Sequence, residues 1–341
     1  MHLADLWFIA IAVLWTGYFF LDGFDFGVGV LLPVVGRSEA DRQAMIRTIG
    51  GVWDGNEVWL IVAAGATFAA FPLWYAAMFS GLYVPLLVIL IALILRGVAF
   101  EFRGRRDSPA WRRTWDAALV FGSLVPAALW GLVFGNIVRG LPVDARFDAD
   151  PGLGGLLNPY SLIGALTSLT VFVMHGAMFL RLRTGGELQV RARAVVSVIG
   201  PVAVLAAVAL VVWIQLHRGS VVTAATAAVA LAALLGAVLE SRSAHSLWAF
   251  LLTGAAIIAG TATLFIALYP DVLPSTTNPA HSLTVQNASS SPYTLTIMTW
   301  VAGIFLPIVL LYQAWTYWVF ARRIDVAREP REKVRRAMAR H

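Results

Sequence analysis

The sequence contains no cysteine, a single lysine (Lys333) and few charged residues of any kind. The absence of cysteine excludes disulfide bonds, iron–sulfur clusters and thiolate metal sites. Charged residues make up 13% of the 341 residues and hydrophobic residues 59%, whereas a soluble domain carries about 25% charged residues. The composition therefore indicates a polytopic membrane protein.

Histidine is also scarce within the apolar segments, where His175 is the single example in mid-segment. A bis-histidine haem inside a helical bundle needs histidines at matching depths on facing helices. We therefore expect this chain to ligate no haem and interpret His175 as a hydrogen-bonded packing residue. The sequence also lacks a phosphate loop, a nucleophile–base arrangement and a zinc-binding spacing, so we expect no catalytic residue and no metal site.

Long apolar runs dominate the sequence instead. A membrane-spanning helix needs about 20 mostly apolar residues, and we expect nine such helices in an all-α integral membrane domain of residues 1–341. The seventh is short and rich in alanine, and is the weakest of the nine. The expected spans are about 3–32, 50–71, 75–100, 115–138, 159–182, 195–216, 222–240, 246–269 and 294–321.

Basic residues collect in alternate loops, which fixes the direction of the helices by the positive-inside rule. Arginine is frequent in residues 34–49, 101–114 and 183–193 and in the basic tail 322–341, whereas residues 270–293 contain neither lysine nor arginine. Nine helices with the N-terminus outside and the C-terminus in the cytoplasm fit this alternation. Because the basic surplus lies in short loops and the tail, we expect no nucleic-acid partner.

Two short stretches place acidic residues within or beside apolar runs. Residues 21–27 include Asp22 and Asp25, and residues 53–59 include Asp54 and Glu57. Carboxylates three residues apart share one face of a helix. One carboxylate deep in lipid costs roughly 2.5–3.5 kcal/mol, and four would cost about 10 kcal/mol, comparable to the stability of a whole domain. We therefore expect all four to face protein or water and to be functional.

The predicted topology brings a third segment to the same depth, because the third helix runs inward and carries Arg96 and Glu101 near its cytoplasmic end. Neighbouring helices joined by short loops tend to pack together, and small residues four apart allow close approach. We expect six ionisable residues to gather in the cytoplasmic third of the membrane and to take up protons. The structural alternative, that the carboxylates only lock helices together, stays open because ion-pair networks have similar properties.

These segments resemble subunit II of the cytochrome bd-type quinol oxidases. The similarity follows the order of the chain over nearly its whole length and is least distinctive at about 185–245. The matching segments are 22–29, 53–60, 68–72, 96–103, 134–136, 274–277, 298–301 and 311–315.

The resemblance implies two four-helix bundles with one peripheral helix, in a heterodimer with a homologous subunit I of the bacterial cytoplasmic membrane. It implies that haem b and haem d belong to subunit I, where quinol is oxidised and oxygen is reduced to water. Some family members hold a structural quinone on subunit II, whose contacts on this chain stay unassigned, or carry small single-helix accessory subunits. In the family, acidic residues at the positions of Asp25 and Asp54 have been proposed to begin a cytoplasmic proton path, and Glu57 replaces a glutamine of some relatives.

We therefore predict that the chain supports subunit I, contacts quinol and lipid, and supplies a cytoplasmic proton-uptake path. The predicted path uses Asp22, Asp25, Asp54, Glu57 and Glu101, with Arg96 as their charge partner. Two alternatives remain: a proton-coupled secondary transporter and a purely structural scaffold subunit. The second half of the chain has no matching acidic pair in mid-span, which disfavours a transporter built from inverted repeats.

Overall fold

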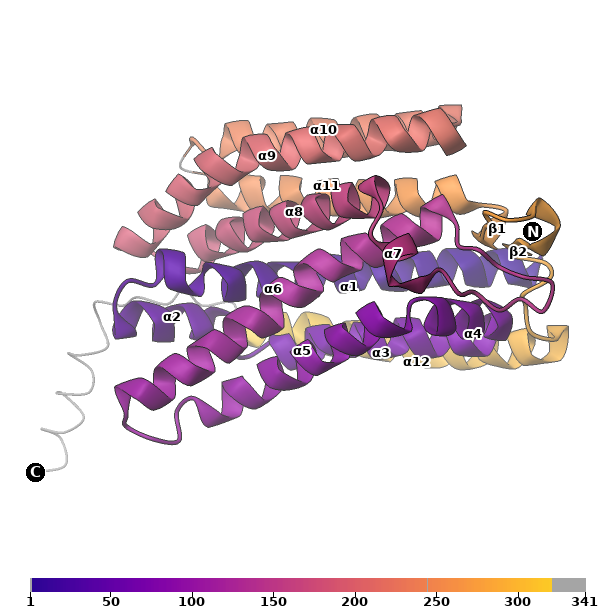
Figure 1. Ribbon diagram of the computed structural model, residues 1–341. Helices are drawn as coiled ribbons and strands as arrows, with labels where there is room; N and C mark the ends of the chain where they lie inside the picture. Colours follow the sequence, from indigo (N-terminus) through magenta and orange to yellow (C-terminus); the bar gives the residue numbers. More distant parts are fainter. Residues whose placement is uncertain (1, 244, 321–341) are drawn as a thin grey trace, which may run out of the picture.

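The computed structural model describes residues 2–243 and 245–320 and is almost entirely α-helical (Figure 1). The first six helices are α1 (Leu3–Val35), α2 (Glu39–Ile49), α3 (Trp53–Ala70), α4 (Pro72–Gly81), α5 (Tyr83–Phe102) and α6 (Pro109–Arg139). They are followed by α7 (Gly152–Leu156), α8 (Pro159–Arg183), α9 (Gly186–Arg218), α10 (Val221–Glu240), α11 (Ser246–Leu268), β1 (Asp271–Leu273), η1 (Pro279–His281), β2 (Leu283–Thr284) and α12 (Pro292–Val319). The predicted basic tail, 322–341, lies outside the described residues.

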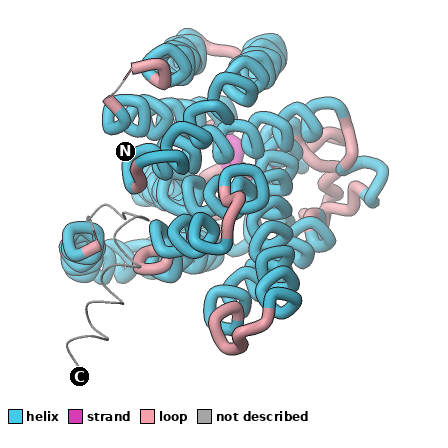
Figure 2. The backbone as a smooth tube through the Cα atoms, turned by 90° about the vertical axis from the view of Figure 1, so that its left-hand side faces the viewer, coloured by secondary structure: helices cyan, strands magenta, loops and turns pink. Residues whose placement is uncertain are grey.

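The long helices lie side by side in two bundles, with one helix outside them (Figure 1, Figure 2). The first bundle comprises α1, α3, α5 and α6. In it, α1 packs against α3 and α6, and α5 packs against α6. The second comprises α8, α9, α10 and α11, and it joins the first where α8 packs on α1 and α6. The peripheral helix, α12, contacts mainly α1 and α3. The predicted all-α fold of a polytopic membrane protein is therefore confirmed.

Eight of the described helices are long and apolar enough to cross a membrane. The second predicted span corresponds to α3, which is not among the eight. It has 18 residues, about 27 Å at 1.5 Å per residue, and its first turns carry Asp54, Asn56 and Glu57. The helix is thus close to the thickness of the membrane core but polar at one end.

Two segments depart locally from the expected spans. The predicted span 75–100 is divided at Leu82 between α4 and α5, because Pro85 in the first turn of α5 has no N–H to donate to the preceding turn. The expected loop 34–49 contains α2. Ser38 and Asp41 form a capping box at its start, each side chain accepting a hydrogen bond from the backbone of the other. We refer to the end of the bundles where α2 lies as the α2 end.

The centre of the molecule is built around α1, because both bundles pack against it. A Cβ atom on Gly27 would overlap the Phe172 carbonyl and the backbone of Gly176, so α1 and α8 cross at a distance that glycine alone permits. On the other side, Trp130 of α6 donates a hydrogen bond to the Tyr18 hydroxyl at 3.1 Å. These contacts fix both the position of α1 and the face that each of its side chains presents.

Candidate functional site

Two buried carboxylates and one partly buried carboxylate surround a buried guanidinium in the first bundle. Asp22 and Asp25 of α1 and Arg96 of α5 are fully buried. The Nη1 atom of Arg96 donates to Asp22 Oδ1 at 2.9 Å, and its Nη2 atom lies 4.0 Å from Asp25 Oδ2. Glu57 of α3, whose side chain is 20% exposed, places Oε1 3.3 Å from the same Nη1 atom. We call these four residues the carboxylate cluster.

The surroundings of Arg96 combine aromatic faces with unpaired polar atoms. Its guanidinium carbon lies 4.7 Å from the centre of the Phe26 ring and 5.8 Å from that of Phe100, distances at which a cation is attracted to an aromatic face. Asp22 Oδ2, Asp25 Oδ1 and the Nε atom of Arg96 have no hydrogen-bond partner among the described residues. Buried polar atoms are normally paired, so this cluster has hydrogen-bonding capacity beyond its own ion pairs.

Asn56 links the carboxylate cluster to the peripheral helix. Its Nδ2 atom donates to Asp25 Oδ2 at 2.7 Å and to the Leu21 carbonyl at 3.3 Å. Its Oδ1 atom accepts hydrogen bonds from Tyr317 at 2.8 Å and from Gln313 at 3.2 Å. These three polar residues were not among those predicted from the sequence, although an amide between two acids and a glutamine within an apolar helix are signals of buried hydrogen bonding.

Asp54 and Glu101 do not join the ion pairs of the cluster. Both are exposed, and Asp54 Oδ1 accepts a hydrogen bond from the backbone of Gly55 at 2.8 Å. Within the described residues, neither carboxylate pairs with Arg96. Asp54 precedes Glu57 by three residues and so lies on the same side of α3. The structure thus brings four of the six predicted residues into contact and leaves the other two on the surface.

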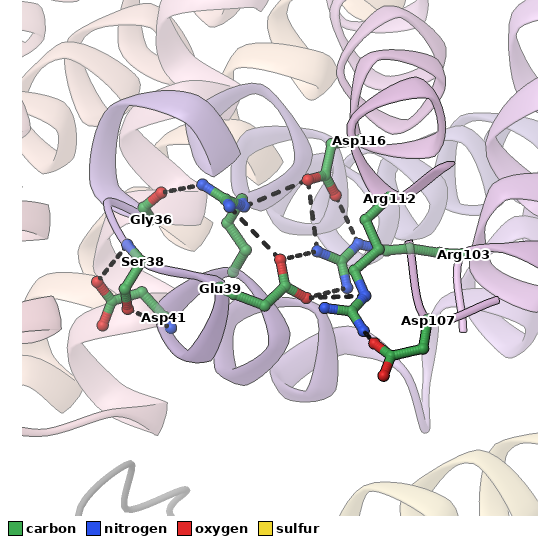
Figure 3. A network of polar contacts seen from close by, with 9 residues as sticks. Gly36, Ser38, Glu39, Asp41, Arg103, Asp107, Arg112 and Asp116 are labelled. Atoms are coloured by element: carbon green, nitrogen blue, oxygen red, sulfur yellow. Dashed lines mark hydrogen bonds and ion pairs between the residues drawn. The ribbon is translucent and has the colours of Figure 1, made fainter. Parts of the chain in front are cut away.

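A second ionic network joins α2 to the ends of α5 and α6 (Figure 3). Arg103 contacts Glu39 at 3.0 Å and Asp116 at 2.5 Å. Arg42 contacts the same two carboxylates at 3.4 and 3.2 Å. Arg112 lies 3.8 Å from Glu39 and also pairs with Asp107. We call these residues the α2 network, and it fastens the segment that follows α1 to the first bundle.

His175 lies in the second bundle beside α1. It is fully buried and stacks on Phe250 with ring centres 4.6 Å apart. Its Nδ1 atom lies 2.6 Å from Thr253 Oγ1 and its Nε2 atom 3.2 Å from the Phe20 carbonyl. Within the described part of the chain, no group of three or more histidine, aspartate or glutamate side chains is placed to hold a metal ion.

A large apolar groove follows α12 along its contact with α1 and α11. It has a volume of about 1160 Å³ and runs from Asp5 and Tyr269 to Gln313 and Tyr317. Apolar pockets of this size accommodate extended hydrophobic ligands. The groove is therefore a place where a long-chain cofactor could lie, and its far end reaches the partners of Asn56.

The fold and the site define a class of protein, namely a polytopic helical membrane protein with a cluster of carboxylates around one buried arginine. Residues 3–320 match the family model described as cytochrome bd terminal oxidase subunit II. The chain is 43% identical over 329 residues to cytochrome bd ubiquinol oxidase subunit 2 of Bacillus subtilis, covering 95% of this chain and 97% of the relative. It is 35% identical over 357 residues to cytochrome bd-I ubiquinol oxidase subunit 2 of Escherichia coli K12, covering 94% of each. The chain therefore belongs to the cytochrome bd terminal oxidase subunit II family.

A solved structure shows the same fold. The bd oxidase from Geobacillus thermodenitrificans superposes with a TM-score of 0.75 at 20% identity, over 94% of this chain and 99% of that one. Membership of the family makes this chain one subunit of a membrane-bound quinol oxidase and implies a subunit I as its partner. Family membership therefore replaces the alternative of a secondary transporter. It does not distinguish a purely structural scaffold subunit from one that also takes up protons.

Proposed function

We propose that this chain supports the haem-bearing subunit I and conducts protons to it from the cytoplasm through the carboxylate cluster. The observation that carries the proposal is the ratio of three carboxylates to one guanidinium in a buried site. With all three acids ionised, the cluster would carry a net charge of −2. Unpaired buried charge is strongly unfavourable, so the cluster gains stability when it binds a proton.

The orientation of the chain follows from its arginines. The α2 end carries the arginine-rich segments 34–49, 101–114 and 183–193, whereas the opposite loop, 270–293, contains neither lysine nor arginine. The positive-inside rule then puts the α2 end in the cytoplasm and the N-terminus outside. In this orientation the carboxylate cluster lies in the cytoplasmic half of the membrane, on the side from which the protons for oxygen reduction are drawn.

The exit of the path lies on the surface shared by α3, α5 and α12. Glu57 of α3 is partly exposed there. The same surface carries large exposed apolar side chains, including Ile61 of α3, Leu90 of α5 and Leu311 of α12. We assign this face to subunit I, which holds haem b and haem d, oxidises quinol and reduces oxygen. We assign the entrance to Asp54 and Glu101, which are exposed at the start of α3 and the end of α5.

Electrical work explains why a polar route is needed. Moving one charge through 100 mV costs about 2.3 kcal/mol even before desolvation. Protons that enter from the cytoplasm, while quinol oxidation releases protons outside, separate charge across the membrane without pumping. A structural quinone and single-helix accessory subunits are compatible with this arrangement, and their contacts on this chain stay unassigned.

The test uses the complete oxidase with Asp25→Asn or Asp22→Asn, and Asp150→Asn in an exposed loop as the matched control. Oxygen consumption, haem content and charge separation in proteoliposomes are measured together. We expect retained haem with turnover lowered roughly 100-fold, in the range for loss of a proton-transfer group, and an unchanged control. Full turnover with undiminished charge separation would refute proton uptake by the cluster. Loss of haem and of assembly would instead favour the scaffold alternative.

A further inference from the structure

A second groove opens between α1, α6, α8 and α9, away from the carboxylate cluster, and has a volume of about 510 Å³. Its walls are mostly aliphatic and include Val34 of α1 and Val198 of α9, which are 58% and 68% exposed. In a membrane protein, such exposed aliphatic walls face the acyl chains of lipids. The groove lies on the α9 side of the molecule, whereas α12 lies on the opposite side (Figure 1).

The residues that line this groove include two arginines and no acidic residue, although Asp41, outside the lining, pairs with Arg191. Arg37 follows the end of α1, is exposed, and makes no hydrogen bond or ion pair with another described residue. Arg191 of α9 is held in place, because it donates to the Val35 carbonyl at 2.6 Å and to Asp41 Oδ2 at 3.0 Å. One guanidinium is therefore available for a ligand and the other is fixed beside it.

We propose that this groove binds one anionic phospholipid of the cytoplasmic leaflet. Its acyl chains lie along the aliphatic walls and its phosphate lies between Arg37 and Arg191. Guanidinium groups match the geometry of a phosphate and pair with it through two hydrogen bonds. Basic pockets between membrane helices on the cytoplasmic side select anionic headgroups, and the orientation derived above puts this rim in that leaflet.

The charge of the rim separates this site from the larger groove along α12. The lining of the α12 groove includes Asp5 and no arginine, so it offers no cation to pair with a phosphate. The proposed lipid site is also independent of proton uptake, because none of the residues that line it belongs to the carboxylate cluster.

The test uses the delipidated complex of both subunits in a neutral detergent. Phosphatidylglycerol or phosphatidylcholine with the same acyl chains is added, and bound lipid is counted by native mass spectrometry alongside the thermal midpoint. The variants are Arg37→Gln, Arg37→Lys and Val198→Trp, which fills the groove. The matched control is Arg105→Gln, an exposed arginine at the same end but outside the groove.

We expect Arg37→Gln to weaken phosphatidylglycerol binding roughly fivefold, the effect of one cation at the membrane surface, and to leave phosphatidylcholine binding unchanged. Arg37→Lys should retain most of the affinity, Val198→Trp should abolish binding of both lipids, and Arg105→Gln should match the wild type. Equal binding of the two lipids by the wild type would overturn the proposal. So would undiminished phosphatidylglycerol binding by Arg37→Gln, or a polypeptide that still occupies the groove after delipidation.

Discussion

Arg96 contacts three carboxylates at once. This ratio of three acidic groups to one cation determines which charge states of the carboxylate cluster are stable. Two like charges about 4 Å apart repel each other by about 4 kcal/mol at an effective dielectric constant of 20. One cation cannot offset all of these repulsions, whereas one bound proton removes a large part of them. A cluster with one cation for each carboxylate would be neutral without a bound proton, and its role would be to hold the helices together.

His175 offers a residue-level prediction that rests on counting hydrogens. Its Nε2 atom faces the Phe20 carbonyl and must carry a hydrogen, so in the neutral ring Nδ1 is an acceptor. The single hydrogen of the Thr253 hydroxyl can go to Nδ1 at 2.6 Å or to the Phe250 carbonyl at 2.8 Å, and we assign it to the shorter contact, with Nδ1. Thr253→Val keeps the shape but leaves Nδ1 buried and unpaired. We expect it to destabilise the complex by about 1–3 kcal/mol, measured by thermal or denaturant unfolding.

The control for this prediction is Thr253→Ser, which keeps the hydroxyl and should stay close to the wild type. Equal stability of the valine and serine variants would mean that the hydrogen bond to Nδ1 contributes nothing. A matching loss in both would instead point to the packing of the threonine methyl group.

The sequence predicts which residues lie at the same depth in the membrane, and so which can meet. It does not predict which face of each helix turns toward its neighbours. Asp22, Asp25, Glu57 and Arg96 meet because topology alone puts them at one level. The exposure of Asp54 could not be predicted, since the face of α3 that turns inward is set by the packing of its neighbours. The apolar runs on either side of Asp54 contain no periodicity strong enough to show it.

At the scale of single elements, α2 depends on its cap and on ionic contacts rather than on burial alone. Burial raises the pKa of Asp41, but hydrogen bonds from Ser38 and Arg191 outweigh burial and hold the pKa below its usual value. A carboxylate with a lowered pKa stabilises the folded state above the pKa of the unfolded chain, about 3.9. That stabilisation is lost as the pH falls through the folded pKa.

We therefore expect Asp41→Asn to loosen α2 at pH 7, with amide hydrogen exchange in residues 39–49 faster by roughly fivefold, equivalent to about 1 kcal/mol. As the pH falls through the lowered folded-state pKa of Asp41, the variant and the wild type should converge, because the wild-type carboxyl becomes protonated. Rates are corrected for the intrinsic effect of pH, and Asp150→Asn in a distant loop serves as the control. A difference that persists unchanged at low pH would show that charge on Asp41 is not the cause.

The existence of α2 was missed although its signals are present in the sequence. Ser38 and Asp41 have capping-box spacing, and the buried Met45 and Ile49 follow at helical spacing. The arginines of this segment are equally typical of a cytoplasmic loop, so they do not distinguish a loop from a helix. The break at Leu82 is similar: Pro85 signals it, but a proline inside a membrane span is also compatible with a continuous, kinked helix.

At the scale of the whole molecule, the two bundles were accessible from hydropathy and from the family resemblance, whereas the place of α12 follows from its contacts. Trp7 donates hydrogen bonds to Thr299 at 3.1 Å and to the Leu295 carbonyl at 3.3 Å near the start of α12. Near its end, Tyr317 and Gln313 bind Asn56. Only 6% of the apolar stretch by which α12 could cross the membrane is buried. The helix is therefore attached near both ends and exposed between them.

The absence of cysteine makes this surface easy to map, since every introduced thiol is the only one in the chain. Leu311 and Leu205 are 73% and 70% exposed, and their helices, α12 and α9, lie on opposite sides of the molecule (Figure 1). A photoreactive label on Leu311→Cys in native membranes should cross-link to subunit I, because a helix with so little burial in its own chain needs a partner to pack against. The same label on Leu205→Cys should react with lipid. Cross-links to subunit I from Leu205→Cys and none from Leu311→Cys would place the partner on the second bundle, and would also remove the proposed exit of protons at α3.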